Sequence, residues 1–344
     1  MPRRSLILIV AGAAVVIAAV VAALLPVPYV ILSPGPTLNT LGTSPGGQPL
    51  ILIAGHKTYP TVGNLNMVTV NFQGGPGNEI NIFTALRAWL DPHDAVVPQQ
   101  ELFPAGQSQQ QVQHQDVVEM TNSEANATAA ALTEAGIGYK TQVQVLSTEP
   151  GMPAARALRA GDIIAKVNGV PIDGLNGLSQ QVRAQGAGRP LRLTVIRHGD
   201  TKLASVTAVR SGGHLVIGVV VTVKFTFPFK VNISVGNIGG PSAGLMFALG
   251  IVDKLRPMNL TGGRFIAGTG EITPAGVVEP IGGIQQKMAG ARAKGATVFL
   301  APAGNCADAR GAVPAGMRLV RVSTLAGAVR SLEALKAGRP VPSC

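Results

Sequence analysis

An unbroken apolar run near the start of the chain constrains its organisation more than any other segment. Residues 5–25 contain no charged side chain, and Arg3 and Arg4 stand directly before them. At about 1.5 Å of rise per residue, a helix of this length spans a bilayer, and the run exceeds the roughly 7–15 residues of a cleavable signal's apolar core. An uncleaved transmembrane anchor is therefore favoured over a signal peptide.

The two arginines indicate how the chain is oriented. Basic residues beside a span favour the cytoplasm, so residues 1–4 are expected as a cytoplasmic basic tip and the chain from Pro26 onward is expected outside. Residues 215–223 are also apolar, but they are too few to cross a bilayer and are β-branched, which is typical of a buried strand. We expect a single crossing of the cell membrane, with membrane lipid as a partner.

Composition indicates about two folded domains after the anchor. The 344 residues include 43 glycines and 25 prolines, which predicts many turns, and 46% hydrophobic residues argue against general disorder. The net charge of +11 is scattered, and aromatic residues make up only 4%. Because neither a basic block nor an aromatic stacking surface stands out, no nucleic-acid partner is expected, and attraction to anionic lipid explains the charge more simply.

Two cysteines, Cys306 and Cys344, would lie in a compartment where disulfides persist. Their even count permits one bridge, and two free thiols are the alternative. Neither cysteine stands in a motif typical of catalysis, and the spacing of metal ligands is absent. We expect no metal and no cofactor.

The segment Gly-Gly-Pro-Ser-Ala-Gly at residues 239–244 leads into an apolar stretch typical of a buried helix. Proline commonly opens a helix, so Ser242 is expected in the first turn. Unpaired backbone N–H groups and the helix dipole would stabilise an oxyanion beside this serine. Serine is also common there for capping alone, so the segment by itself does not establish catalysis.

A second segment, residues 279–291, is predicted to form a Pro/Gly turn and then a helix with Lys287 about one turn inside it. A lysine acts as a general base only when neutral, so its pKa has to fall from about 10.4 toward the working pH. Ile284, Met288 and Ala291 stand at helical spacing and would supply an apolar wall that lowers the pKa. A solvated surface lysine is the ordinary alternative, which only a pairing with Ser242 outweighs.

Together these segments resemble the proteolytic domain of the Lon family. In that family a Gly-Pro-Ser-Ala-Gly turn, a Thr-Gly-Glu strand and a Pro-Ile-Gly-Gly-x-x-x-Lys turn follow one another. The chain has all three in this order, at residues 240–244, 269–271 and 280–287. Three ordered motifs make a specific signal.

The resemblance implies a role for each matching residue. Ser242 corresponds to the nucleophile, Lys287 to the general base and Thr269 to the hydroxyl that orients the lysine amine, with the backbone N–H groups of Gly239 and Ser242 as the oxyanion hole. The family usually has an aspartate where Gly239 stands, a departure that removes no catalytic side chain. No Gly-x-x-x-x-Gly-Lys-Ser/Thr run occurs, so the Lon ATPase module is missing, and substrates are expected to be unfolded or exposed polypeptides.

Residues 143–209 carry another pattern, in which strand-like segments alternate with turns and a short helix. Pro-Gly-Met-Pro-Ala-Ala and Ala-Gly-Asp-Ile-Ile-x-x-Val-Asn-Gly resemble the PDZ domains of exported bacterial proteases. Such domains bind a peptide C-terminus by adding it as a strand to a sheet edge. Gly136, Ile137, Gly138 and Tyr139 are the candidate carboxylate-binding loop, and an ordinary helix stop is the alternative for them.

The expected fold class is α+β, with an N-terminal transmembrane helix and a PDZ domain (a small β-barrel with two helices) inserted before a Lon-type α/β proteolytic domain. This arrangement resembles a bacterial family of membrane-anchored, ATPase-free Lon-like serine proteases. The expected divisions are the basic tip at 1–4, the anchor at 5–25, the N-terminal part of the Lon-like domain at 26–135, the PDZ domain at 136–212 and the Ser-Lys proteolytic domain at 213–344.

The implied function is that of an ATP-independent serine endopeptidase with a Ser-Lys dyad, whose PDZ domain binds peptide C-termini. The alternative is an anchored PDZ adaptor with an inactive Lon-like scaffold. Retention of both Ser242 and Lys287 favours the enzyme, because a scaffold needs neither. None of the five histidines stands in a motif that pairs it with a serine. The Lon resemblance also suggests a ring-shaped homo-oligomer, although no residue identifies its interface.

Overall fold

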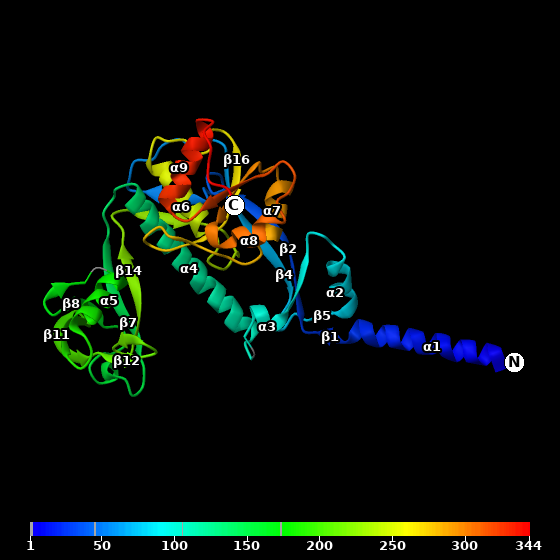
Figure 1. Ribbon diagram of the computed structural model, residues 1–344, viewed down its shortest axis with the longest axis horizontal. Coiled ribbons are helices and arrows are strands. Elements are labelled where there is room, and N and C mark those ends of the chain that lie inside the picture. The colour runs from blue at the N-terminus through cyan, green and yellow to red at the C-terminus, as the bar shows by residue number, and fades with distance from the viewer. Residues whose placement is uncertain (1–2, 45, 105, 173) are drawn as a thin grey trace. The chain divides into compact units, whose positions relative to one another are not determined.

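The computed structural model describes residues 3–44, 46–104, 106–172 and 174–344, which divide into two compact units. Unit 1 comprises the chain up to Ile137 together with Phe229–Cys344, and unit 2 comprises Gly138–Pro228. Unit 2 therefore interrupts unit 1 in sequence, as the colours of Figure 1 show.

The sequence pattern predicted that the PDZ domain ends at residue 212, whereas unit 2 continues to Pro228. Strand β14 (Val219–Thr226) pairs antiparallel with β7 (Lys140–Thr148) in the sheet of unit 2. The prediction of one buried strand over 215–223 is wrong, because β13 (His214–Val216) and β14 are separate strands and no residue of β14 is fully buried. This pairing assigns the segment after 212 to unit 2.

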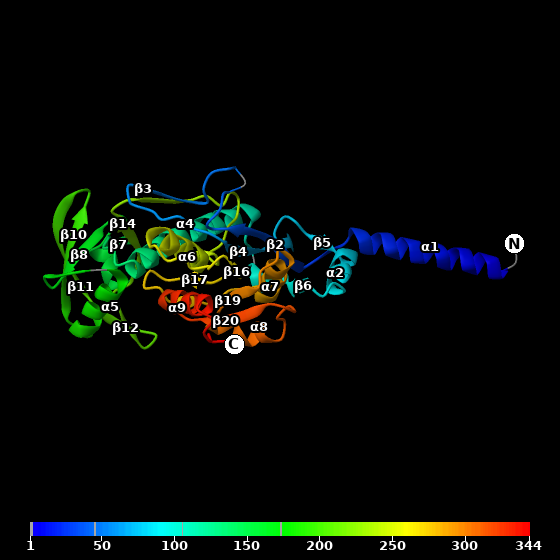
Figure 2. The ribbon, with the colours of Figure 1, turned by 90° about the horizontal axis from the view of Figure 1, so that it is seen from above.

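The apolar run forms α1 (Arg3–Leu24), in which Ile7–Leu24 is long and apolar enough to cross a membrane, with a mean hydropathy of 3.0. None of that window is buried against the rest of the protein. A signal sequence near an N-terminus satisfies the same criteria, so the helix alone does not establish an anchor. Directly after α1, strand β1 (Pro26–Val27) pairs with β5 (Ile80–Asn81), and Figure 1 shows the two strands together at this end of the helix. Figure 2 shows the same end of α1 from above.

Unit 1 is built on a mixed six-stranded sheet with the strand order β20-β19-β16-β4-β2-β6. The four strands from β20 to β4 are parallel, whereas β2 is antiparallel to both of its neighbours. The strand bounds are β2 Tyr29–Asn39, β4 Asn64–Gly74, β6 Ala95–Pro98, β16 Phe265–Gly268, β19 Val298–Pro302 and β20 Arg318–Val322. Strands that precede unit 2 in the sequence and strands that follow it thus share one sheet.

Helices and short strand pairs complete unit 1. Helix α6 is buried at every position except Lys254, and α4 and α9 pack against it, while α7 packs on β2 and β4. The helices are α2 Ile82–Trp89, α3 Gln99–Leu102, α4 Gln109–Glu134, α6 Gly244–Leu255, α7 Ile284–Ala293, α8 Cys306–Arg310 and α9 Leu325–Lys336. The paired strands are β3 Ile51–Ala54 with β15 Lys230–Ile233, and β17 Glu271–Ile272 with β18 Val278–Glu279.

Cys306 and Cys344 form a disulfide, with 5.1 Å between their Cα atoms. The bridge ties the last residue of the chain to the start of α8. The sequence left open one disulfide or two free thiols, and the structure contains the disulfide. It leaves no free cysteine among the described residues.

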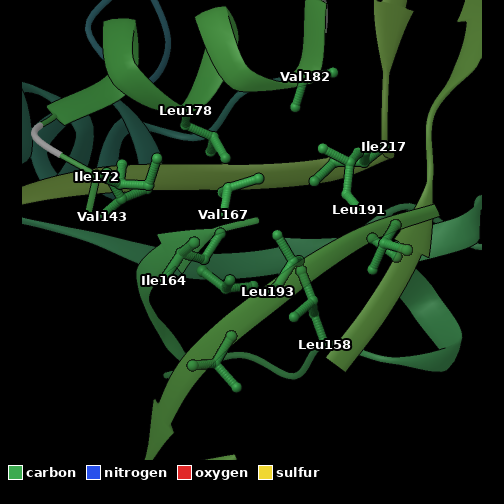
Figure 3. Packing of buried hydrophobic residues seen from close by; sticks show 14 of the residues in the cluster. Val143, Leu158, Ile164, Val167, Ile172, Leu178, Val182, Leu191, Leu193 and Ile217 are labelled. Atoms are coloured by element: carbon green, nitrogen blue, oxygen red, sulfur yellow. The ribbon is translucent and has the colours of Figure 1, made fainter. Parts of the chain in front are cut away.

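Unit 2 is a small sheet closed on one side by α5 (Gly174–Gln185), with the strand order β11-β10-β8-β7-β14. Its core is apolar: in Figure 3, Leu178 and Val182 of α5 point toward Val167 and Leu191 of the sheet. The remaining elements are β8 Ile163–Val167, β9 Val170–Pro171, β10 Pro190–Arg197, β11 Asp200–Thr207, β12 Val209–Ser211 and the 3₁₀ turn Pro153–Arg156.

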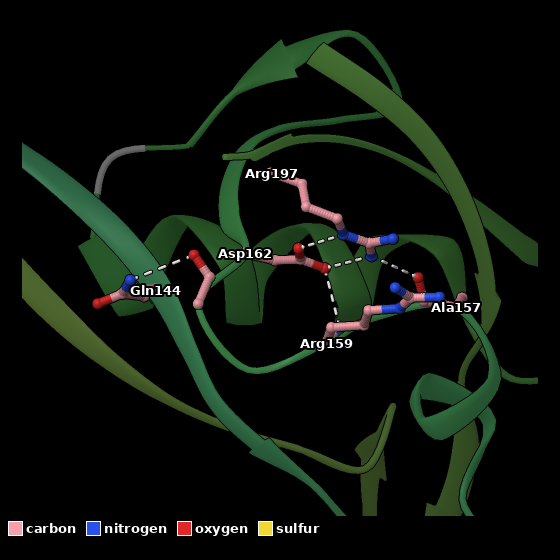
Figure 4. Close-up of polar contacts among 6 residues, drawn as sticks. Gln144, Ala157, Arg159, Asp162 and Arg197 are labelled. Carbon is pink, nitrogen blue, oxygen red and sulfur yellow. Dashed lines mark hydrogen bonds and ion pairs between the residues drawn. The ribbon is translucent and has the colours of Figure 1, made fainter. Parts of the chain in front are cut away.

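The aspartate of the Ala-Gly-Asp motif, Asp162, forms a buried ion pair in unit 2. Asp162 is 1% exposed and accepts two hydrogen bonds of 2.7 Å from the Arg197 guanidinium and one of 2.9 Å from the backbone N–H of Arg159 (Figure 4). The bonds from Arg197, more than any other contact, hold the pKa of Asp162 below its usual value. The turn before β8 is fixed by this paired carboxylate.

Candidate active site

Ser242 and Lys287 line one cleft of about 620 Å³ in unit 1. The walls of the cleft come from β4, from α4, from the loop before α6 and from the turn before α7. No hydrogen bond joins the two side chains in the described part of the chain. Such contacts are often long in an enzyme without substrate and tighten when the complex forms.

Ser242 lies just before α6 and not in its first turn, which corrects the prediction from sequence. Helix α6 begins at Gly244, and the carbonyl of Ala243 accepts the first intrahelical bonds. The Ser242 carbonyl accepts a hydrogen bond instead from the backbone N–H of Gly270 at 2.9 Å, outside the helix. No side-chain hydrogen bond caps α6, so Ser242 is not a capping serine in this structure.

Thr269 contacts the backbone of Ser242. Its side chain is fully buried, and its hydroxyl donates to the Ser242 carbonyl oxygen at 3.0 Å. The resemblance implied a hydrogen bond to the Lys287 amine, and the structure gives the hydroxyl proton this other acceptor. Thr269 therefore positions the residue that carries the candidate nucleophile.

Two hydrogen bonds join the loop before α6 to helix α4, and two backbone N–H groups of the loop stay without a partner in the described chain. Gly240 donates its N–H to the Asp116 carbonyl at 3.2 Å, and the Ser123 hydroxyl donates to the Pro241 carbonyl at 2.9 Å. The N–H groups of Gly239 and Ser242 have no hydrogen-bond partner among the described residues, and both residues line the cleft. These are the two donors that the resemblance assigns to an oxyanion hole.

Helix α4 leaves no room for a side chain at position 239. A Cβ atom there would lie 2.6 Å from the Cβ of Asp116, a separation that real side chains do not tolerate. Helix α4 thus occupies the space in which a larger residue would sit. In this structure the close approach of α4 leaves room only for glycine at position 239.

Lys287 is a buried lysine, only 4% exposed. Its neighbours on α7, Ile284, Met288 and Ala291, are buried as well. Burial lowers the pKa of Lys287 to about 8, because a charged amine is poorly solvated in these surroundings. In the described ranges of the chain, the amine forms no ion pair and no side-chain hydrogen bond, so nothing offsets this effect.

Three carboxylates also line the cleft: Asp116 and Glu119 from α4, and Glu271 from β17. Burial raises the pKa of Asp116, and Glu119 adds to the effect. Burial likewise raises the pKa of Glu271, with smaller contributions from Glu279 and Glu119. Part of the lining of the cleft is therefore acidic, whereas the lowered pKa of Lys287 has burial as its cause.

Of the four residues proposed as a carboxylate loop, Gly136 and Ile137 end helix α4, and Gly138 and Tyr139 begin unit 2. Gly136 has a φ of +73°, its N–H donates to the Thr133 carbonyl, and the N–H of Ile137 donates to the Leu132 carbonyl at 2.8 Å. This is the Schellman arrangement of a helix stop. None of the four residues lines the groove of unit 2, and the helix-stop alternative describes Gly136 and Ile137.

That groove, of about 460 Å³, lies between α5 and the segment β13–β14, and sequence reasoning missed it. Strand β14 is the last strand of its sheet, so its outer edge faces the groove. Ile217 and Gly218 form the turn between β13 and β14, and their N–H groups donate no hydrogen bond within the described chain. The available signal was a glycine, Gly218, inside an apolar, strand-like run; in the structure it has a φ of +74°.

Comparison with known proteins yields two domain families. A PDZ domain family model matches residues 118–208, and the model of the Lon protease (S16) C-terminal proteolytic domain matches residues 229–330. The PDZ match begins inside α4, earlier than unit 2 does. The predicted mixed α+β class, with a PDZ domain and a Lon-type domain, is confirmed.

Curated relatives match only the region of the Lon-type motifs and its surroundings. The Lon protease of Heliobacterium modesticaldum is 35% identical over 123 residues, which are 35% of this chain and 14% of that protein. Lon protease 1 of Sorangium cellulosum is 48% identical over 71 residues, 20% of this chain and 8% of that protein. This chain thus spans a small part of the relatives it matches.

A search of solved structures found the PDZ domain of the SdrC-like protein from Listeria innocua. It is 23% identical, has a TM-score of 0.22, and covers 23% of this chain and 92% of that domain.

Replacing Lys287 by methionine is expected to stabilise the fold. The fall in the pKa of Lys287 from 10.5 to about 8 corresponds to about 3 kcal/mol of destabilisation at neutral pH, where the buried amine is charged. Between these pH values the unfolded chain binds a proton that the folded chain does not. The free energy of unfolding of the wild type should therefore rise with pH across this window, and that of Lys287→Met should rise less, since burial also lowers the pKa of Lys254.

Denaturant unfolding at pH 7 and pH 10 measures this difference. Lys294→Met is the matched control, because Lys294 is exposed and ends the same helix. Equal stabilities of the wild type and Lys287→Met at pH 7 would show that the amine is not buried as described.

Proposed function

We propose that this chain, which joins a PDZ domain to a Lon-type proteolytic domain, is an ATP-independent serine endopeptidase. Ser242 is the nucleophile and Lys287 is the general base. One observation supports this most: a buried lysine with a pKa near 8 shares a cleft with a serine that does not cap its helix. A structural lysine would be expected to have a carboxylate partner or solvent around it.

The proposed reaction uses groups that line the cleft. The neutral Lys287 amine takes the proton of the Ser242 hydroxyl, and the hydroxyl oxygen attacks the peptide carbonyl carbon. The N–H groups of Gly239 and Ser242 bind the resulting oxyanion, and the protonated lysine gives its proton to the leaving amine. Lys287 then takes a proton from a water molecule, whose oxygen attacks the acyl carbon, and gives that proton to the Ser242 oxygen as the ester bond breaks, which restores both groups.

The cleft suits an extended substrate. Strand β16 pairs with β4 only over Asn64–Met67, whereas Val68–Phe72 of β4 line the cleft without a strand on that side in the described chain. A polypeptide in extended conformation would add to this free edge by main-chain hydrogen bonds and bring its carbonyl to Ser242. A folded substrate would not reach the edge, so the proposed substrates are unfolded or exposed polypeptide segments.

The proposed site of action is outside the cytoplasm, with α1 as a single-pass anchor. Arg3 and Arg4 before the span support a cytoplasmic N-terminus. The Cys306–Cys344 disulfide supports an oxidising compartment, because cytoplasmic reductants keep most thiols reduced. A ring-shaped homo-oligomer stays a prediction on which this proposal does not depend.

For unit 2, the proposed ligand is the C-terminus of a polypeptide. The peptide would extend the sheet at the outer edge of β14, with its carboxylate at the N–H groups of Ile217 and Gly218. Its last side chain would lie against Leu178 and Val182, which line the groove. This binding would also serve an adaptor without proteolytic activity, so the cleft and the groove need separate tests.

Ser242→Ala and Lys287→Ala are each expected to abolish cleavage of an unfolded protein by the full chain in detergent without nucleotide, since either change removes the nucleophile or its base. The rate should fall by at least about a thousandfold. Lys294→Ala is the control that changes an exposed lysine on the edge of the same helix. Near-normal cleavage by either site variant would refute the dyad, and an inactive wild type that still binds peptides would favour the adaptor.

Leu175→Asp is expected to weaken peptide binding to unit 2. Leu175 is 44% exposed and lines the groove, so the change adds a charge that repels the peptide carboxylate without emptying the core. Fluorescence anisotropy with a peptide of apolar C-terminus should show a loss of about tenfold in affinity. Leu203→Asp, which alters an 83% exposed leucine outside the groove, should bind normally. Equal affinities of the two variants would place the peptide elsewhere.

A further inference from the structure

Helix α2 carries its large apolar side chains on its outer face. The exposed fractions are 38% for Ile82, 50% for Phe83, 48% for Leu86, 73% for Trp89 and 81% for Leu90. Their spacing along the chain places these five residues on one side of a helix. We call this set the α2 outer face.

The inner side of α2 is made of small residues. Ala85 and Ala88 are buried and pack with Ile31 and Ile80 in a separate apolar cluster of unit 1. The buried contacts of α2 in this cluster therefore come from two alanines, whereas the larger residues of the α2 outer face stay 38–81% exposed. An exposed apolar patch of this kind marks a surface for a partner.

The position of α2 identifies that partner. Strand β1, directly after α1, pairs with β5, directly before α2, through the partners Pro26–Asn81 and Val27–Ile80. Asn81 also caps α2 by accepting a hydrogen bond of 2.9 Å from the N–H of Thr84. Helix α1 contacts α2 itself, and Figures 1 and 2 both show α2 beside the end of α1 that joins unit 1.

We propose that the α2 outer face lies in the lipid interface on the extracytoplasmic side of the membrane, as a second membrane contact beside the anchor. This inference rests on the proposed anchoring by α1. Where α1 leaves the bilayer, the β1–β5 pairing holds α2 at the level of the headgroups. Tryptophan favours this level, and an interfacial helix buries its apolar face by about 5–10 Å.

The charges around α2 indicate what drives the contact. Arg87 is the basic residue of the helix, whereas Glu79 precedes it and Asp91 and Asp94 follow it. Since acidic residues outnumber the arginine, attraction to anionic lipid does not hold α2 at the membrane, and burial of the apolar face does. The contact is therefore expected with zwitterionic lipid and in high salt.

A second contact would limit the motion of unit 1. A single helix followed by a short linker lets a domain tilt and rotate over the membrane. With α2 also seated in the interface, unit 1 would keep one orientation, so that the cleft opens at a fixed direction relative to the lipid surface.

Trp89 is the only tryptophan of the chain, so fluorescence excited at a wavelength that tryptophan absorbs and tyrosine does not reports on the α2 outer face alone. The full chain is reconstituted in phosphatidylcholine vesicles, and flotation with the vesicles is verified first. Lipid brominated near the top of its acyl chains should then quench Trp89, and aqueous acrylamide should quench it weakly. The emission maximum should be blue-shifted relative to that of the chain unfolded in denaturant.

The double variant Phe83→Ser, Leu86→Ser should lose about half or more of the quenching by brominated lipid, since the remaining face is less apolar. Leu203→Ser, an equally simple change of an exposed leucine in unit 2, should lose none. Trp89 open to acrylamide and unaffected by brominated lipid would overturn the inference. Protection from acrylamide without lipid quenching would also overturn it and indicate contact with protein. A chain that does not float overturns the anchor and, with it, this inference.

Discussion

The burial of one amine, that of Lys287, is the interaction on which the account of this protein depends. Helix α7 packs on β2 and β4 and thereby encloses a side chain that is only 4% exposed and has no partner among the described residues. The same burial that destabilises the charged amine lowers its pKa to about 8 and makes a neutral base available near physiological pH. A fold selected for stability alone would place an apolar residue here.

The second constraint is the backbone around Ser242. Its carbonyl is held by Thr269 and Gly270, and the carbonyl of Pro241 is held by Ser123 of α4. The loop is thus fixed from two sides through its acceptors, while the donors that face the cleft stay free. Strand β16 leads into Thr269, and α4 contacts the loop from the other side. The sheet and the helices of unit 1 therefore position Ser242 together.

Much of this could be predicted from the sequence, because the motifs around Ser242 and Lys287 are local and their order is specific. The errors concern interactions between distant segments. The start of α6 at Gly244 depends on the bond from Gly270 to the Ser242 carbonyl, and the end of unit 2 at Pro228 depends on the pairing of β14 with β7. Gly136 fits a helix stop or a binding loop equally well as a sequence, and only the end of α4 distinguishes the two.

The pH dependence of kcat/KM for cleavage of an unfolded substrate tests the central claim most directly, because this ratio reports the pKa of groups in the free enzyme. If Lys287 acts as a neutral base in its buried site, kcat/KM should rise about tenfold per pH unit at low pH and level off above about 8. A rise that continues to the pKa of an ordinary lysine, near 10.4, would contradict the account, because it would show that the base is solvated.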